Sequence, residues 1–313
     1  MLTLLPAVID VLDHIILCLE MIWRNRKQST NVDDRRSHCG GGVGLPSIGT
    51  ILFVWPVIKG LFRSKLGLAI LGIGVIAYLG GFIDLPLLGG GSNRVIDEDS
   101  DNEQAAFIKT VLADTEAVWS EVFTQAGRRY PAPTLVLYRG STVSGCGPAS
   151  AGMGPFYCPE DQKVYVDLGF FTELEREQGA GGDFAQAYVL AHEIGHHIQN
   201  MEGTLAQVQM AKQRVLGEAK KNQLQVRLEL QADCYAGIWA NHAHKQFDIL
   251  EEGDLDEALV AAASIGDDRM QKQARGFAIP HTFTHGSSKQ RVEWFARGVK
   301  NGRLSDCETF AEQ

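Results

Sequence analysis

The chain contains little basic charge, few cysteines and no internal repeat. Its 29 lysine and arginine residues are outnumbered by 38 acidic residues, which gives a formal net charge of −9. A nucleic-acid-binding protein needs a basic surface to displace counterions from the phosphates, so this composition argues against nucleic-acid partners. Six cysteines in 313 residues are too few for a disulfide-scaffold mini-protein, and the absence of a Cys-x-x-Cys spacing argues against a zinc–thiolate site.

The remaining composition is that of a folded chain whose charge is unevenly distributed. Hydrophobic residues make up 45% of it, which is enough to fill a core, and the length suggests one or two domains. Residues 1–65 carry eight basic and five acidic side chains, a net charge of +3, which leaves −12 on the other 248 residues. This split favours a membrane protein whose basic segment faces the cytoplasm.

An uncharged run of 18 residues at 66–83 has the composition of a membrane span. A helix of this length covers roughly 27 Å, close to the hydrocarbon thickness of a bilayer. Basic side chains precede the run and acidic side chains follow it, which predicts a cytoplasmic N-terminus and an external body. A buried core helix is the alternative. Residues 40–58 are also uncharged, but prolines and glycines interrupt them, and we expect an interfacial or re-entrant segment.

The pattern divides the chain into four parts. They are a basic N-terminal segment (1–65), one transmembrane helix (66–85), a glycine-rich linker (86–95) and a soluble domain (96–313). No signal-peptide cleavage site is evident, so the anchor is expected to stay attached. Residues 1–20 hold charges that suit a membrane poorly, and a translation start at Met21 instead of Met1 is a second possibility.

The soluble domain combines short strands with longer helices. Periodicity predicts strands at 134–138 and 163–167 and helices at 103–126, 183–202 and 222–244. Asp183 with Gln186, and Ser287 with Gln290, have the spacing of capping boxes at helix starts. We therefore expect an α+β domain with a small sheet and predominant helices.

The predicted helix at 183–202 carries the pattern HExxH at residues 192–196. Residues four apart lie on one helix face about 6 Å apart, so His192 and His196 can both reach one zinc ion. Glu193 then lies beside the metal, where it can act as a general base toward water. His197 points about 100° away from His196 and is expected to pack or to face solvent. Histidines without a metal are the alternative.

A catalytic zinc ion takes three protein ligands and leaves one position open. Glu229 is the candidate third ligand, and two imidazoles with one carboxylate suit a single Zn²⁺ ion, although geometry and availability decide among divalent ions. Asp233 lies one turn further on the same face and can accept the free N–H of a ligating histidine. A solvated acidic face is the alternative. Apolar neighbours argue for a largely buried helix, in which carboxylates need partners.

HEIGHHIQ at 192–199 and ELQADCYAG at 229–237 resemble the bacterial neutral zinc metallopeptidases, and the likeness covers most of the chain, from Trp23 to Cys307. The pairing HExxH…ExxAD is more distantly similar to the CAAX prenyl protease type of membrane gluzincins. The resemblance implies a zincin-like metallopeptidase domain. It further implies that the zinc ligands are His192, His196 and Glu229, that the general base is Glu193, and that the carboxylate behind the ligands is Asp233.

In the distant family a His-Pro motif precedes an arginine by six positions, and His285 and Arg291 keep that spacing here. The resemblance implies that both stabilise the oxyanion formed when water attacks a peptide carbonyl. Gly286 stands where the relatives carry proline, which leaves the path of this loop open. A surface position is the alternative for Arg291. The resemblance also implies that the sheet edge near 163–167 binds substrate by strand addition, and Tyr165 either lines that cleft or belongs to the core.

Four cysteines in the soluble domain suit an oxidising compartment. Three pairings are possible, and Cys146–Cys158 is favoured because it closes a short loop, which leaves Cys234 and Cys307 as the second pair. The external location predicted from the charges flanking 66–83 agrees with disulfides. Four reduced thiols are the alternative.

Taken together, these patterns predict a membrane-anchored zinc endopeptidase whose partners are a peptide or protein substrate and the lipid bilayer. Its catalytic domain is expected on the periplasmic or extracellular side of a single-pass anchor in the cell membrane. The alternative is a non-catalytic, membrane-tethered peptide-binding or assembly factor with a structural zinc ion. Cleavage within the membrane is disfavoured, because the HExxH helix is not part of the predicted span.

Overall fold

The computed structural model describes residues 21–37 and 98–310. The uncharged runs at 40–58 and 66–83, the predicted linker and residues 1–20 lie outside these described residues. Among the helices of the described residues, none has the length and hydropathy that a membrane crossing requires. Residues 21–37 and 98–310 fall in the same compact unit of the chain.

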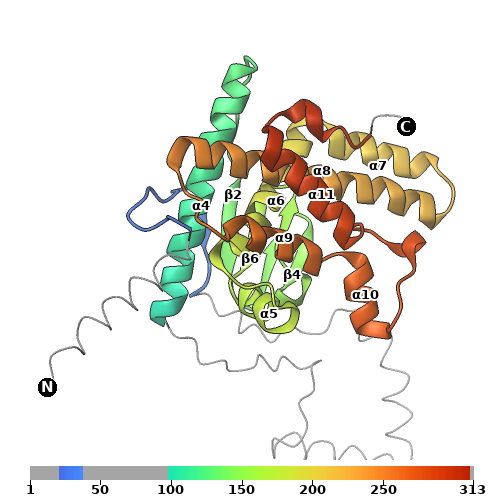
Figure 1. The fold of residues 1–313 in the computed structure, drawn as a ribbon, viewed down its shortest axis with the longest axis horizontal. Helices are drawn as coiled ribbons and strands as arrows, with labels where there is room; N and C mark the ends of the chain where they lie inside the picture. Colours follow the sequence, from blue (N-terminus) through green and yellow to red (C-terminus); the bar gives the residue numbers. More distant parts are fainter. Residues whose placement is uncertain (1–20, 38–97, 311–313) are drawn as a thin grey trace, which may run out of the picture. The chain divides into compact units, whose positions relative to one another are not determined.

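A four-stranded sheet lies at the centre of the described fold (Figure 1). Its strands, in spatial order, are β1 (Val32–Asp34), β2 (Thr134–Tyr138), β6 (Lys163–Asp167) and β5 (Phe156–Cys158). The first three strands are parallel, and β5 runs antiparallel to β6. Strands β2 and β6 have the bounds expected from the sequence. A separate hairpin pairs β3 (Ser141–Ser144) with β4 (Gly147–Ser150).

Both faces of the sheet are buried. Successive side chains of a strand point to opposite faces, so β2 and β6 each supply two sets of core residues. Leu135, Leu137, Val164 and Val166 belong to the main core. Val136, Tyr138 and Tyr165 belong to a smaller cluster. Burial on both faces explains why these strands, which pair in parallel, read as nearly continuous apolar runs.

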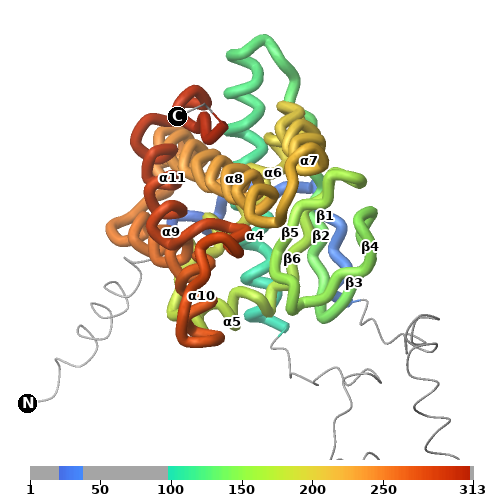
Figure 2. The backbone as a smooth tube through the Cα atoms, turned by 90° about the vertical axis from the view of Figure 1, so that its right-hand side faces the viewer, coloured from blue at the N-terminus to red at the C-terminus, as the bar shows by residue number. Residues whose placement is uncertain are grey.

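Helices make up most of the remaining described chain. They are α4 (Glu98–Gln125), α5 (Gly169–Gln178), α6 (Asp183–Glu202), α7 (Thr204–Arg214), α8 (Glu218–Phe247), α9 (Asp254–Ser264), α10 (Asp267–Arg275) and α11 (Ser288–Asn301). Short 3-10 turns occur at η3 (Ala151–Met153), η4 (Pro280–Thr282) and η5 (Leu304–Cys307). Helix α6 packs against α8 and α9, and α8 packs against α11. Figure 2 shows the β3–β4 hairpin on the side of the sheet away from α6 and α8. The predicted α+β class with predominant helices is confirmed.

The two predicted capping boxes have different outcomes. Ser287 and Gln290 form one at the start of α11, as expected. Helix α6 begins at Asp183, but a glycine occupies its cap position and no side-chain cap bond forms there. The backbone N–H of Phe184 instead donates to a carboxylate oxygen of Glu257 in α9, at 3.2 Å. A carboxylate distant in sequence therefore satisfies a donor that local spacing assigned to Asp183.

Strand β1 corrects the expected domain organisation. Residues 1–65 were predicted to form a separate segment, across a membrane from the soluble domain. Val32–Asp34 instead pair with β2, and Nη2 of Arg26 donates to Oδ1 of Asp114 in α4 at 2.7 Å. Residues 21–37 are thus part of the same sheet and core as the later chain.

Candidate metal centre

The HExxH segment lies in the middle of α6, where this helix crosses close to α8. A Cβ atom on Gly195 would lie 3.0 Å from the carbonyl oxygen of Ala232, closer than side chains normally approach a backbone. The glycine therefore permits a close approach of the two helices. This approach brings the candidate ligands of α6 next to the acidic side chains of α8.

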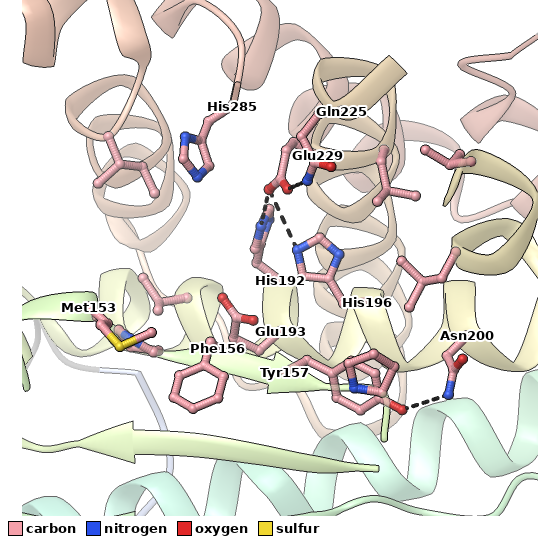
Figure 3. Close-up of a pocket in the computed structure, with 18 of the residues that line it drawn as sticks. Met153, Phe156, Tyr157, His192, Glu193, His196, Asn200, Gln225, Glu229 and His285 are labelled. Atoms are coloured by element: carbon pink, nitrogen blue, oxygen red, sulfur yellow. Dashed lines mark hydrogen bonds and ion pairs between the residues drawn. The ribbon is translucent and has the colours of Figure 1, made fainter. Parts of the chain in front are cut away.

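Three candidate ligand atoms meet between these helices. Nε2 of His192 lies 3.3 Å from Oε2 of Glu229, and Nε2 of His196 lies 3.5 Å from the same oxygen (Figure 3). Each of the three residues offers one ligand atom, and these atoms lie within 4.8 Å of one another. Two imidazole nitrogens and a carboxylate oxygen are the donor set of a catalytic zinc site. Glu229 follows His196 by 33 residues in the sequence, so the structure brings together ligands from two separate helices.

A charged network supports His192. Its Nδ1 donates to Oδ1 of Asp233 at 2.8 Å. Arg291 of α11 donates through Nε and Nη2 to the two oxygens of Asp233, each at 2.8 Å, and Tyr188 donates to Oδ1 at 2.6 Å. Burial alone would raise the pKa of Asp233, but the charges of Arg291 and His192 lower it to about 2. The ionised carboxylate fixes the proton on Nδ1 and leaves the Nε2 lone pair for a metal.

A neutral network supports His196. Its Nδ1 donates to Oε1 of Gln199 at 2.8 Å. The amide nitrogen of Gln199 donates to the carbonyl of Leu228 at 2.6 Å and to Oε1 of Gln231 at 3.1 Å. Gln231 in turn donates to the carbonyl of Cys307 at 3.2 Å. Gln199 is not among the residues predicted from the sequence, although its position three residues after His196 on one helix face is a usable signal.

The charges at the site favour a cation. Burial opposes ionisation of Glu229, yet the imidazoles of His196 and His192 hold its pKa well below the ordinary value. Burial also opposes protonation of His196, yet Glu229 and Glu193 raise its pKa to about 9. Glu229 is therefore ionised while His196 holds a proton, and a divalent cation bound at these atoms would pair with the carboxylate and displace the proton of the imidazole.

The ligand atoms open into a cleft of about 920 Å³. Glu193 points into this cleft from α6, and burial raises the pKa of its carboxyl group, opposed by the charges of His196 and His192 (Figure 3). His285 enters from the loop before α11 with 52% of its side chain exposed, and its ring points into the cleft on the side of Glu229 (Figure 3). Its Nδ1 lies 3.4 Å from Oδ1 of Asp267.

Arg291 occupies a different environment from the one expected. It is only 2% exposed, and its guanidinium binds Asp233 and Tyr188 instead of pointing freely into the cleft. We therefore assign it to support of His192 through Asp233, in place of the oxyanion role suggested by the resemblance.

The loop that carries His285 differs from a His-Pro loop at Gly286. Gly286 has φ of 94°, which proline cannot adopt because its ring fixes φ near −65°. The carboxylate of Asp267 accepts the backbone N–H groups of Thr284, His285 and Gly286. These bonds hold the loop along a path that the proline of the relatives would not permit.

The sheet edge beside the cleft is β5 and not the strand at 163–167. Strand β6 lies inside the sheet between β2 and β5, and β5 packs against α6. Tyr165 is 1% exposed and stacks on Phe156 at 4.8 Å between ring centroids, so it belongs to the core. Phe156 and Tyr157 line the cleft. His197 is buried and contacts the hydroxyl of Tyr157 and the carbonyl of Pro131, which makes it a packing residue.

Two disulfide bonds occur in the described chain. Cys146 is joined to Cys158, and Cys234 is joined to Cys307. These are the pairings that the sequence favoured. The second bond connects η5 to α8, one turn from Gln231 of the neutral network.

Comparisons with known proteins identify the family of the chain. A family model described as "Putative neutral zinc metallopeptidase" matches residues 21–310. The chain is 44% identical over 292 residues to uncharacterized protein YpfJ of Escherichia coli strain K12, across 93% of this chain and 99% of that protein. It is 44% identical over 206 residues to uncharacterized protein Mb2605 of Mycobacterium bovis, across 63% of this chain and 67% of that protein. No solved structure matches. With the family model extending over most of its length, the chain belongs to the family that carries this description.

Proposed function

We propose that the chain is a zinc-dependent endopeptidase. The observation that carries this proposal is the meeting of His192, His196 and Glu229 in a cleft that Glu193 also faces. Three protein ligands leave one coordination position for water or substrate, as a catalytic zinc site requires. The bonds from Nδ1 of each histidine to Asp233 or Gln199 support the same assignment, because they direct both Nε2 lone pairs toward a common point.

The chain's own residues supply the remaining chemistry. A zinc ion held by these ligands would polarise a peptide carbonyl and lower the pKa of water. Glu193 takes a proton from the attacking water and returns it to the leaving amine, for which a buried carboxyl group with a raised pKa is suited. His285 donates an N–H to the oxyanion as it forms. Strand β5, at the edge of the sheet, binds the peptide backbone by strand addition.

Glu193→Gln tests this mechanism. The variant should bind zinc as the wild type does, because the three ligands are unchanged, while peptide cleavage falls about a hundred- to ten-thousand-fold. Zinc content is measured by elemental analysis and cleavage with a mixed peptide library, in the presence and absence of a chelator. Glu202→Gln, at the end of the same helix, is the matched control. A wild-type protein that binds zinc and peptides but cleaves none would instead be a peptide-binding factor.

We further propose that the peptidase is anchored in the cell membrane. Because the paired strands β1 and β2 must lie on the same side of the membrane, the proposed topology differs from the single crossing predicted from the sequence. The apolar run at 66–83 supports an anchor, and the pairing of β1 with β2 supports an even number of crossings. Two crossings, at 40–58 and 66–83, place the basic side chains of 59–65 in the cytoplasm, where positive charge is favoured. The cleft and both disulfides then lie outside, in an oxidising compartment.

Protease accessibility tests the topology. A cleavable tag inserted at residue 62 should be protected in bacterial spheroplasts, whereas tags before residue 21 and after residue 313 should be cut by added protease. Protection of the tag before residue 21, together with cleavage after residue 313, would restore a single crossing and contradict the proposed topology.

A further inference from the structure

Lys212, in α7, lines the part of the cleft that lies beside α7 and α8. It lines the cleft together with Gln209 and Gln225. Among the lining residues that the structure describes, the other lysine or arginine is Arg291, whose charge is matched by the buried carboxylate of Asp233. Lys212 is therefore the cation of this lining that is available to a ligand.

A chain of two hydrogen bonds connects Lys212 to the candidate metal centre. Nζ of Lys212 donates to Oε1 of Gln225. Nε2 of Gln225 donates to Oε1 of Glu229 at 2.6 Å. The amide of Gln225 is thereby oriented with its oxygen toward the lysine and its nitrogen toward the metal ligand. Two hydrogen bonds, through a single side chain, therefore separate the ammonium from the carboxylate of Glu229.

The ammonium has no carboxylate partner of its own in the described part of the chain. Partial burial lowers the pKa of Lys212, and the acid whose charge opposes this effect is Glu229. Glu229, however, lies against His192 and His196 and is a candidate metal ligand. A partly desolvated cation without an ion-pair partner is unfavourable, and a bound carboxylate would offset that cost.

We propose that Lys212 binds a carboxylate group of the substrate, so that the peptidase prefers peptides with an acidic group near the scissile bond. This inference rests on the proposed peptidase function and deepens it by naming a substrate class. An acidic side chain and a free C-terminal carboxylate offer the same chemistry. Peptides that carry only one of these carboxylates separate the two sources.

The test compares peptides that differ in a single charge, using the full chain loaded with zinc. Fluorogenic peptides carry Glu or Gln at one position on either side of the scissile bond, and each is made with a free or an amidated C-terminus. A charge-assisted hydrogen bond should raise kcat/KM for the carboxylate-bearing peptide about ten- to a hundredfold over its neutral partner. A preference that follows the Glu position identifies a side chain, and one that follows the free terminus identifies the terminal carboxylate.

Substitutions assign the preference to Lys212. Lys212→Met should remove it, Lys212→Arg should keep it, and Lys212→Glu should reverse it in favour of peptides with Lys at the same position. Arg214→Glu makes the same change in charge at an exposed position of α7 outside the cleft lining, and should keep the wild-type ratio. Binding of the same peptides to zinc-loaded Glu193→Gln, measured by fluorescence anisotropy, gives a readout that does not depend on cleavage.

The outcomes distinguish failure of the carboxylate preference from failure of the proposed peptidase function. Equal kcat/KM and equal binding for acidic and neutral peptides in the wild type would overturn the inference and leave the peptidase proposal intact. An equal loss for both peptides in Lys212→Met would assign Lys212 to positioning of Gln225 and Glu229, and would also overturn it. A chain that cleaves no peptide but binds acidic peptides more tightly through Lys212 would refute the peptidase function alone.

Discussion

The two candidate histidine ligands, His192 and His196, are oriented by different kinds of hydrogen-bond partner. His192 is held by Asp233, an ionised carboxylate that is itself paired with Arg291. His196 is held by Gln199, a neutral amide that bonds onward to a carbonyl and a second amide. Both arrangements fix the proton on Nδ1. They differ in the element that they contact, since the charged network extends to α11 and the neutral one to η5.

This difference predicts which substitutions around the two histidines should destabilise the protein most. A buried ion pair that loses one partner leaves an uncompensated charge, which costs several kcal/mol. A buried amide that loses its partner costs less, about 1–3 kcal/mol. The support of His192 should therefore be the more damaging to disturb, although the two histidines lie one turn apart on the same helix.

The largest effect is expected from Asp233→Asn. This change leaves the guanidinium of Arg291 buried without a carboxylate, so the free energy of unfolding should fall by about 3–5 kcal/mol. Zinc affinity should fall about 10–100-fold, because the proton on Nδ1 of His192 loses its ionised acceptor. Urea denaturation and competition with a zinc-binding dye measure the two effects. Asp256→Asn, at an exposed position of α9, is the control. Unchanged stability would show that Arg291 finds another partner.

The wild-type protein offers a second view of the same interaction. Because the pKa of Asp233 is lowered from 3.8 to about 2, its carboxylate stabilises the folded state fully above the unfolded pKa. This contribution is lost as pH falls from about 4 toward 2, so stability should decline in that window. The contribution should be missing from Asp233→Asn, and an identical acid decline in the variant would contradict the assignment.

Loss of the Cys234–Cys307 bond is expected to have the next largest effect. Its cysteines are 73 residues apart, against 12 for Cys146–Cys158. Chain entropy predicts a cost of about 2–4 kcal/mol for a typical disulfide, and about 1.5 kcal/mol more for the longer loop than for the shorter. The double Cys→Ala variants are compared by thermal denaturation. The variant at 234 and 307 should also bind zinc more weakly, since the neutral network ends at Cys307. Equal zinc affinities in both variants would show that the Cys234–Cys307 bond does not support the metal centre.

Gln199→Leu tests the neutral network directly. The change keeps most of the side-chain volume but removes the acceptor of His196 and the donor to the carbonyl of Leu228. We expect a loss of about 1–3 kcal/mol in stability and a decrease of about tenfold in zinc affinity. Gln213→Leu, at an exposed position of α7, is the control. A larger loss than in Asp233→Asn would reverse the ranking of the two networks.

The wild-type protein should also show a pH dependence of zinc binding, which needs no substitution. The pKa of His196 is raised to about 9 in the metal-free protein, so its imidazole holds a proton at neutral pH that zinc must displace. Zinc affinity should therefore rise with pH, by about tenfold per unit for each proton displaced, and level off near pH 9. Dye competition between pH 6 and 9 measures the slope. An affinity that is constant over this range would mean that no proton is displaced.

The sequence predicted those parts of the site that depend on local periodicity. Four-residue spacing on a helix identified His192 with His196 and Glu229 with Asp233, and it placed the helices that carry them. It did not identify Tyr188, whose bond to Asp233 depends on how two helices cross. Strand β5 has three residues within a glycine- and proline-rich stretch, too few to show a period.

The failures have the same physical origin. Asp183 has the spacing of a cap, but the competing carboxylate comes from α9, which sequence spacing cannot reveal. The charge pattern and the uncharged run at 66–83 separate the N-terminal segment from the later chain, whereas β1 pairs with a strand about a hundred residues further on. Long-range pairing of this kind leaves no local pattern in either segment.

Strand β1 means that the described fold is completed by two separate stretches of the chain, residues 21–37 and 98–310. Residues 21–37 are retained by the ladder with β2 and by ion pairs from Arg26 and Arg36 to α4, and these contacts do not depend on an intact connection between residues 38 and 97. A polypeptide cut in that connection would keep both fragments together. The described fold could accordingly be reconstituted by complementation, with the short fragment supplied as a peptide that completes the sheet.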